Sequence, residues 1–306
     1  MAAAHPLESF LKLEKVGTDI FRAQKLLNVE AYRNRLYGGQ TAALALAASY
    51  QTIPENFYCN SLHSYFLRPG TNNGQPVEFR VERVKDGKTF ATRLTNAFQG
   101  NRMLYASQMS FAQRGPSPVN YQGQMPRVPE PEGLEDYPVF LQRRINDKSL
   151  SEMEKELHKS YLDYYIPQVG IRLCDHRLIG ETKPQIMAWM RTNGTVESRD
   201  PRVHQGMALF SSDYFFVDTA LFLTKTEALS KGLMAPSMSH NVWFHDVDAI
   251  RADEWALCET NCDAIGSNLA KSSGKFWSRD GKLLLSIAQE VFLISDADSK
   301  NDKAKL

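Results

Sequence analysis

The sequence is poor in cysteine and contains no long apolar run. Its 306 residues include four cysteines, too few for a disulfide framework, which is typical of a protein in a reducing compartment. No window reaches the roughly 18 consecutive apolar residues that a membrane-spanning helix needs. The amino terminus has no basic start followed by an apolar stretch. We therefore expect neither a secretory signal nor a membrane span.

An excess of charge of one sign is also missing. The 36 basic and 35 acidic residues leave a formal net charge of +1, which argues against a broad surface for nucleic acid or anionic membranes. A local basic pocket for a phosphorylated ligand stays compatible with this balance. With 42% hydrophobic residues, the chain has the composition of a globular protein and the length of two domains.

Three common catalytic signatures are absent. There is no Gly-x-Ser-x-Gly elbow, which argues against the mechanism of the α/β-hydrolases. There is no Walker A loop, and Gly38-Gly39 lacks the spacing of a dinucleotide-binding fingerprint. Any hydrolysis would therefore use other groups.

Prolines divide the chain. Six of the fourteen prolines lie within residues 114–138, and because proline fixes φ and lacks an N–H, this stretch is predicted to be an extended linker without helix or inner strand. We expect a first domain over residues 1–113, the linker and a connecting segment over 114–160, and a second domain over 161–295.

The first half combines one buried helix with several strands. Residues 38–49 consist of small helix formers without a charge, so this helix has no polar stripe and is expected to be buried against a sheet. Apolar runs separated by turn signals then predict an antiparallel meander, with strands at 62–67, 77–84, 89–98 and 103–112. The pattern predicts an α+β fold whose curved sheet wraps around a central helix, the hotdog arrangement.

The second half repeats this plan. A strand is predicted at 186–191, the helix at 203–212, and a meander at 242–244, 255–262, 269–278 and 283–294. Residues 100–111 align without gaps on 281–292, with glycine, leucine, glutamine and phenylalanine coinciding at a constant offset of 181. We interpret this as a duplicated domain.

Two polar residues fall where apolar ones are expected. Gln289 lies on an otherwise aliphatic face of the last predicted strand, where its amide needs hydrogen-bond partners; Gln108 is its counterpart in the repeat. Asp213 lies among apolar and aromatic residues at the predicted buried helix. Such a carboxylate either faces solvent or acts as a base with a shifted pKa. Either residue could also be purely structural.

Other candidate groups are less specific. Ser237 precedes a predicted strand, where a hydroxyl is usually part of a turn. His240 and His245 point to opposite faces of a strand, so a shared metal ion is not expected. Cys258 and Cys262 fit a role as small hydrophobic residues.

Taken in order, the motifs resemble those of the acyl-CoA thioesterase II family, the double-hotdog enzymes of bacteria and peroxisomes. The resemblance covers about residues 8–295 and is carried by the segments Tyr37-Gly-Gly-Gln-Thr-Ala42, Ser61-Leu-His-Ser-Tyr-Phe-Leu-Arg-Pro-Gly70, Val81–Phe90, Ser107–Ala112, Ser211-Ser-Asp213, His240-Asn-Val-Trp-Phe-His245, Arg251-Ala-Asp-Glu-Trp255 and Ala288-Gln-Glu290. Ser239 and Asn60 stand where family members often have aspartate and histidine.

The resemblance implies a tandem hotdog fold and hydrolysis of fatty acyl-CoA without a covalent intermediate, a metal or another cofactor. The family's aspartate, hydroxyl and glutamine fall on Asp213, Ser237 and Gln289. Asp213 would act as a general base on a water that the other two orient. Substrate contacts are expected from residues within the motifs, namely Gly39, Gln40, His63 and His240.

Two alternatives stay open at this point: a non-catalytic acyl-CoA-binding or scaffold protein, and an enoyl-CoA hydratase-like hotdog enzyme. In the first half, Ala48 or Ser49 stands near the aspartate position, so that half is expected to be structural. Family members often assemble further, which makes a homo-oligomer possible.

The last residues indicate a destination. Ala304-Lys305-Leu306 is a small–basic–leucine tripeptide similar to Ser-Lys-Leu, the peroxisomal address. It follows a polar stretch, so residues 296–306 are expected to be a disordered tail that a peroxisomal import receptor binds. The expected location is the peroxisome matrix.

Overall fold

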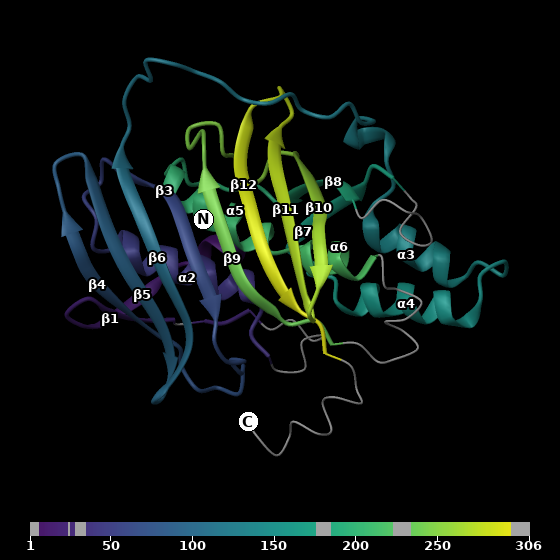
Figure 1. Cartoon of the computed structure of the whole chain (residues 1–306), viewed down its shortest axis with the longest axis horizontal. Coiled ribbons are helices and arrows are strands. Elements are labelled where there is room, and N and C mark those ends of the chain that lie inside the picture. The colour runs from purple at the N-terminus through teal and green to yellow at the C-terminus, as the bar shows by residue number, and fades with distance from the viewer. Residues whose placement is uncertain (1–5, 24, 28–34, 176–184, 223–233, 295–306) are drawn as a thin grey trace.

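Twelve antiparallel strands form one curved sheet that runs through both halves of the chain (Figure 1). The computed structural model describes residues 6–23, 25–27, 35–175, 185–222 and 234–294. The first half contributes β1 (Leu13–Gly17), β2 (Ile20–Ala23), β3 (Phe57–Phe66), β4 (Glu78–Asp86), β5 (Phe90–Gln99) and β6 (Arg102–Gln113). The second half contributes β7 (Val169–Leu173), β8 (Gln185–Thr192), β9 (Ser237–Phe244), β10 (Ala256–Gly266), β11 (Leu269–Ser278) and β12 (Leu283–Phe292).

The two halves join at the centre of the sheet. The strand order is β1-β2-β4-β5-β6-β3-β9-β12-β11-β10-β8-β7, so β3 of the first half pairs with β9 of the second. Leu62 lies opposite Val242 in this pairing, and both side chains are fully buried. A continuous core therefore crosses the junction.

Each half packs a long helix on the same side of the sheet (Figure 1). These are α2 (Gly38–Tyr50) and α5 (Pro201–Ser212), which also pack against each other. The predicted buried helix at 38–49 is confirmed: every residue from Ala42 to Leu46 is at most 1% exposed. Small side chains at this position allow the helix backbone to approach the sheet closely.

Helix α5 begins and ends close to its predicted bounds. Asp200 caps it by accepting a hydrogen bond from the Arg202 N–H, and Pro201 occupies the first turn, where its missing N–H costs nothing. Asp213 directly follows the last residue, Ser212. The candidate base therefore lies at the end of the helix that the sequence predicted.

Several smaller elements were not predicted. They are β1, β2, β7, α1 (Pro6–Phe10), η2 (Pro131–Gly133), α3 (Tyr137–Ile145), α4 (Glu152–Asp163) and α6 (Phe216–Phe222). The expectation of no helix up to residue 138 is wrong at its end, because Pro138 lies in the first turn of α3, where proline is favoured. α4 starts with a capping box between Ser151 and Glu154 and crosses the boundary predicted at residue 160. The domain boundaries stay a prediction.

None of the helices in the described ranges is long and apolar enough to span a membrane.

The proline-rich segment is extended over residues 114–130 and leads from β6 to the helices at the far end of the second half (Figure 1). It packs on a row of outward-facing side chains on neighbouring strands, Trp189, Leu257 and Trp277. The Trp189 indole donates to the Pro129 carbonyl at 2.8 Å. The side-chain amide of Gln122 bonds to the backbone of Gly281 and Leu283. The linker thus covers apolar side chains on the outer face of the second half.

The repeat at an offset of 181 does not preserve the face of the strand. Gln289 is 1% exposed, whereas Gln108 is exposed on β6 and its neighbours Ser107 and Met109 point inward. Side chains of a strand alternate between its two faces, and both β6 and β12 bury their odd-numbered residues. An offset of 181 is odd, so it aligns an exposed residue of β6 with a buried residue of β12. The expectation that Gln108 occupies the place of Gln289 is therefore wrong.

Candidate active site

The candidate site lies where α2 of the first half meets the end of α5 of the second. The Gly39 N–H, in the first turn of α2, donates to Oδ2 of Asp213 at 2.9 Å. Beside it, the Tyr37 hydroxyl donates to the Phe210 carbonyl at 3.0 Å. The positive end of the α2 dipole thus faces a carboxylate that lies at the negative end of α5. Each half of the chain supplies one side of the site.

The two glycines that open α2 make this approach possible. A Cβ on Gly39 would lie 2.3 Å from the Phe210 carbonyl oxygen, and a Cβ on Gly38 would lie 2.6 Å from Oδ2 of Asp213. Contacts this short do not occur between real Cβ atoms and other heavy atoms. Gly39, expected to contact the substrate, is seen to hold the candidate base.

Asp213 is a buried carboxylate with one open oxygen. Its side chain is 6% exposed, and its Oδ1 has no hydrogen-bond partner among the described residues. Burial raises the pKa of Asp213 above its ordinary value, and His240, the Gln289 amide and the Gly39 N–H oppose this rise. A carboxylate that is poorly solvated and has a free oxygen is suited to accept a proton.

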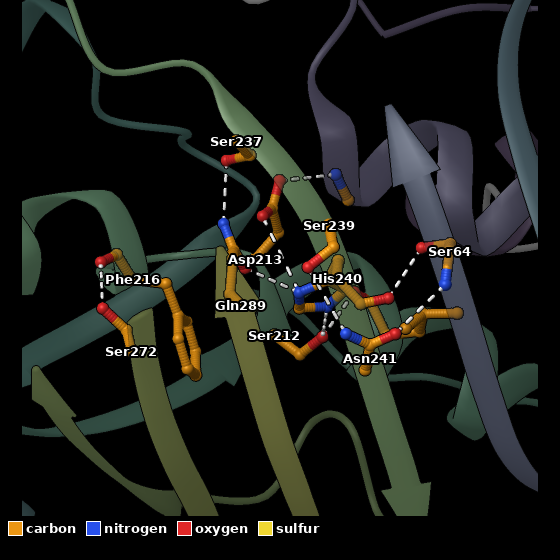
Figure 2. Close-up of polar contacts among 12 residues, drawn as sticks. Ser64, Ser212, Asp213, Phe216, Ser237, Ser239, His240, Asn241, Ser272 and Gln289 are labelled. Carbon is orange, nitrogen blue, oxygen red and sulfur yellow. Dashed lines mark hydrogen bonds and ion pairs between the residues drawn. The ribbon is translucent and has the colours of Figure 1, made fainter. Parts of the chain in front are cut away.

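A chain of hydrogen bonds connects the other two predicted residues (Figure 2). His240 and Gln289 lie opposite each other on β9 and β12, and Nδ1 of His240 lies 2.7 Å from Oε1 of Gln289. The Gln289 Nε2 donates to the Ser237 hydroxyl oxygen at 2.8 Å. Nδ1 of His240 is also 3.9 Å from Oδ1 of Asp213. The structure therefore brings Asp213, Ser237 and Gln289 together around His240.

His240, expected to contact the substrate, lies inside the cluster. Its side chain is fully buried, and its second ring nitrogen, Nε2, lies 2.9 Å from the Ser212 hydroxyl. Burial lowers the pKa of His240, with Asp213 opposing the shift, so the ring is neutral at pH 7. Both ring nitrogens lie within hydrogen-bond distance of protein groups; direct contact of His240 with the substrate stays a prediction.

Gln40 and His63, the other residues expected to contact the substrate, lie in different places. Gln40 is buried in the first turn of α2, where its Oε1 accepts from the Leu27 N–H at 2.5 Å and its Nε2 has no partner within the described part of the chain. His63 is exposed and packs edge-on against Trp243, with ring centroids 5.1 Å apart. Its neighbour Ser64 points inward instead and donates to the His240 carbonyl. The alternation of β3 thus keeps His63 out of the cluster.

Sequence reasoning missed Ser212 and Tyr105. Ser212 directly precedes Asp213, but only the fold shows that its hydroxyl meets His240. The Tyr105 hydroxyl is fully buried and has no partner in the described ranges. Burial raises the pKa of this phenol, and the charge of Asp213 adds to the rise. A tyrosine on a strand with period-two burial carries no signal in the sequence that separates it from an ordinary core residue.

The opposite end of the α2–α5 pair contains a different arrangement. There the Tyr50 hydroxyl donates to Oε1 of Gln205 and accepts from the Cys59 N–H, while the Gln205 amide donates to the Cys59 carbonyl. These groups satisfy one another and include no carboxylate. Gln51, the exposed residue that follows α2, stands where Asp213 follows α5; the expected counterparts Ala48 and Ser49 lie inside the helix.

The second histidine of the strand motif does not join the first. His245 directly follows the last residue of β9. Its Nε2 lies 2.8 Å from the hydroxyl of Ser286, which is not part of the cluster around His240. Within the described residues, no group of three or more histidine, cysteine or acidic side chains is placed to hold a metal ion.

Comparison with known proteins places this geometry in context. Residues 29–112 match the family model described as the acyl-CoA thioesterase N-terminal domain, and residues 135–293 match that of the C-terminal domain. The chain is 32% identical to acyl-coenzyme A thioesterase 8 of Rattus norvegicus, over 92% of this chain and 87% of that protein. It is 26% identical to peroxisomal acyl-coenzyme A thioester hydrolase 1 of Saccharomyces cerevisiae, over 94% of each.

A solved structure is similar over almost the whole chain. The crystal structure of an acyl-CoA thioesterase II from Mycobacterium marinum superimposes with a TM-score of 0.74 at 25% sequence identity. The alignment covers 95% of this chain and 99% of that one. The predicted double-hotdog fold is confirmed.

Proposed function

Because the chain belongs to the acyl-CoA thioesterase family, we propose that it hydrolyses acyl-CoA thioesters to the free acid and CoA. The observation that carries the assignment of the site is Oδ1 of Asp213, a buried carboxylate oxygen that has no hydrogen-bond partner in the described part of the chain. It lies near the N-terminus of α2 and the Gln289–Ser237 pair. Fatty acyl-CoA is the proposed substrate class, which places the enzyme in lipid and fatty acid metabolism.

The reaction needs one water and no covalent intermediate. Asp213 removes a proton from a water whose oxygen attacks the thioester carbonyl carbon, while Ser237 and Gln289 hold that water in place. The tetrahedral intermediate then collapses, the C–S bond breaks, and the proton held by Asp213 passes to the leaving thiolate of CoA. The chain's own contribution is positioning and proton transfer.

The first turn of α2 is suited to stabilise the oxyanion of that intermediate. The first N–H groups of a helix have no intrahelical partner, and Tyr37, the residue before α2, provides no side-chain cap for them. The Gly39 N–H is bonded to Asp213, and we propose that neighbouring N–H groups in the same turn bind the oxyanion. The Nε2 of Gln40, which has no partner among the described residues, supports a substrate contact by that residue as well.

The direct test is thiol release from acyl-CoAs of short to long chain by the purified protein. Hydrolysis by the native chain would support the proposal, and the profile of chain lengths would describe the acyl pocket. Binding of acyl-CoA without thiol release would contradict it and favour a binding protein. Hydration of an enoyl-CoA without thiol release would favour the hydratase-like alternative.

The rate of hydrolysis should fall on the acid side of neutrality. Asp213 accepts a proton only when ionised, and its pKa is raised above the ordinary 3.8, so the acid limb of kcat/KM should have its inflection above that value. We expect a pH profile from about pH 3 to pH 9 to show this limb. An inflection at or below 3.8 would contradict a base in this environment. The limb should vanish in the residual activity of Asp213→Asn.

We propose a peroxisomal location, supported by the name of the yeast relative and by the tripeptide Ala304-Lys305-Leu306. The tripeptide and the predicted tail 296–306 lie outside the described residues. A fluorescent reporter carrying the last six residues should gather in peroxisomes through the import receptor. A reporter ending in Ala304-Lys305-Ala is the matched control. Diffuse fluorescence from both reporters would contradict the proposed location.

Assembly of the chain into a homo-oligomer stays a prediction.

A further inference from the structure

We propose that His240 is a positioning residue that sets the orientation of the Gln289 amide and, through it, the hydrogen bonding of Ser237. This inference rests on the proposed function, in which Gln289 and Ser237 hold the attacking water. This role differs from substrate binding, because the ring of His240 is fully buried and protein groups lie within hydrogen-bond distance of both its nitrogens.

The hydrogen bonds of His240 determine which end of the amide faces it. A glutamine amide can present either its oxygen or its NH₂ group to a neighbour. With its hydrogen on Nδ1, neutral His240 donates to Oε1 of Gln289 over 2.7 Å. The amide then has to point its Nε2 at Ser237, as observed at 2.8 Å.

The Ser212 hydroxyl is compatible with this form of the imidazole ring. It lies 2.9 Å from Nε2 of His240 and 2.9 Å from the Leu209 carbonyl, and its single hydrogen can go to only one of these acceptors. With the ring hydrogen on Nδ1, as the contact with Oε1 of Gln289 requires, the Ser212 hydroxyl donates to Nε2. If it donated to the Leu209 carbonyl instead, Nε2 would carry the ring hydrogen and the Gln289 amide would have to turn over.

The ring has little freedom to move. The backbone of His240 is paired with β12 at Gln289 and with β3 at Ser64. Its carbonyl accepts from the Ser64 hydroxyl at 2.6 Å. The rings of His240 and Phe216 pack in a T-shaped arrangement, with their centroids 6.2 Å apart. A side chain held this firmly can fix the direction of its neighbours.

The orientation matters for Ser237. When Gln289 donates to the Ser237 oxygen, the hydroxyl hydrogen of Ser237 stays available to the water that Asp213 activates. If the amide turned over, its oxygen would accept that hydrogen instead. The water would then lose the hydrogen bond that the Ser237 hydroxyl donates to it. Because this bond positions the water for the chemical step, its loss should lower kcat and leave KM nearly unchanged.

The test is a double-mutant cycle on kcat with His240→Leu and Gln289→Ala. His240→Leu alone should lower kcat by about ten- to a hundredfold, with KM within about twofold of the native value. Added to Gln289→Ala, it should lower kcat no further, because the two residues act as a unit. His240→Asn should retain most of the native kcat, since the asparagine Nδ2 can replace Nδ1 as the donor to Oε1 of Gln289.

His158→Asn is the matched control for structural effects. His158 is also a buried histidine, bonded to the Glu154 carbonyl in α4, so its substitution should lower thermal stability and leave kcat and KM unchanged. Multiplicative losses from His240→Leu and Gln289→Ala would overturn the inference, as would a loss that His240→Asn does not restore. Both results would leave the proposed hydrolysis intact, because that depends on thiol release by the native chain.

Discussion

Replacing Asp213 by asparagine is expected to lower kcat by about two to four orders of magnitude, with little change in KM. Asparagine keeps the shape of the side chain and an oxygen for the Gly39 N–H, but it cannot accept a proton from water. The loss should therefore fall on the chemical step. Thiol release measured over a range of acyl-CoA concentrations separates kcat from KM.

The same substitution should leave the fold at least as stable as the native protein at pH 7. Burial raises the pKa of Asp213 in the folded state, so the protonated form is favoured by folding and the ionised form is disfavoured. The stability that this acid contributes is present below its unfolded pKa and is lost as the pH rises through the folded pKa. Asparagine, being neutral at every pH, avoids this loss.

Denaturant unfolding at about pH 4 and pH 7 provides the control. The free energy of unfolding of the native protein should fall relative to that of the variant as the pH rises. A variant that retained native kcat would remove Asp213 from the mechanism. Loss of activity together with a collapse of stability at pH 7 would instead indicate a structural role.

Gly39→Ala should have the second largest effect. The added Cβ would lie 2.3 Å from the Phe210 carbonyl and 2.7 Å from the Tyr37 ring, so the start of α2 must move away from α5. Overpacking of this kind costs about 1–3 kcal/mol of stability. A displacement of about 1 Å between the helix and Asp213 would lower kcat about a hundredfold. Kinetics and denaturant unfolding measure the two effects.

Gly115→Ala is the matched control, because a Cβ there meets nothing within 4 Å. It should leave both kcat and the free energy of unfolding unchanged. Native kinetics in Gly39→Ala would show that the contact between the two helices can relax without disturbing the site.

The main features of the fold could be predicted from the sequence because they depend on local pattern. The uncharged helix of small residues, 38–49, and the strands with period-two burial need only neighbouring residues to be recognised. Gln289 could be singled out in the same way, as a polar group on an aliphatic face. These predictions agree with α2 and β12 within two residues at each end.

The rest depended on contacts between distant residues. No local pattern relates Gly39 to Asp213, or Ser212 to His240, since these pairs meet only when the fold brings the end of α5 next to α2 and to His240 on β9. The exposure of Gln108 follows from the face that β6 buries, which an alignment of the repeats does not contain. The motifs assigned His63 and His240 the same role, contact with the substrate. In the fold, the alternation of side chains along the strands leaves His63 exposed on β3 and His240 buried on β9.

The contact of α2 with α5 has a consequence for how such a chain can diverge. In a dimer of identical hotdog subunits, two-fold symmetry would repeat each junction, so any substitution at one would appear at the other. Joining the subunits in one polypeptide removes that constraint. One junction here has Gly39 and Asp213, and the other has Tyr50 and Gln205. Covalent fusion therefore allows one junction to carry the proposed site while the other is held by hydrogen bonds among Tyr50, Gln205 and Cys59.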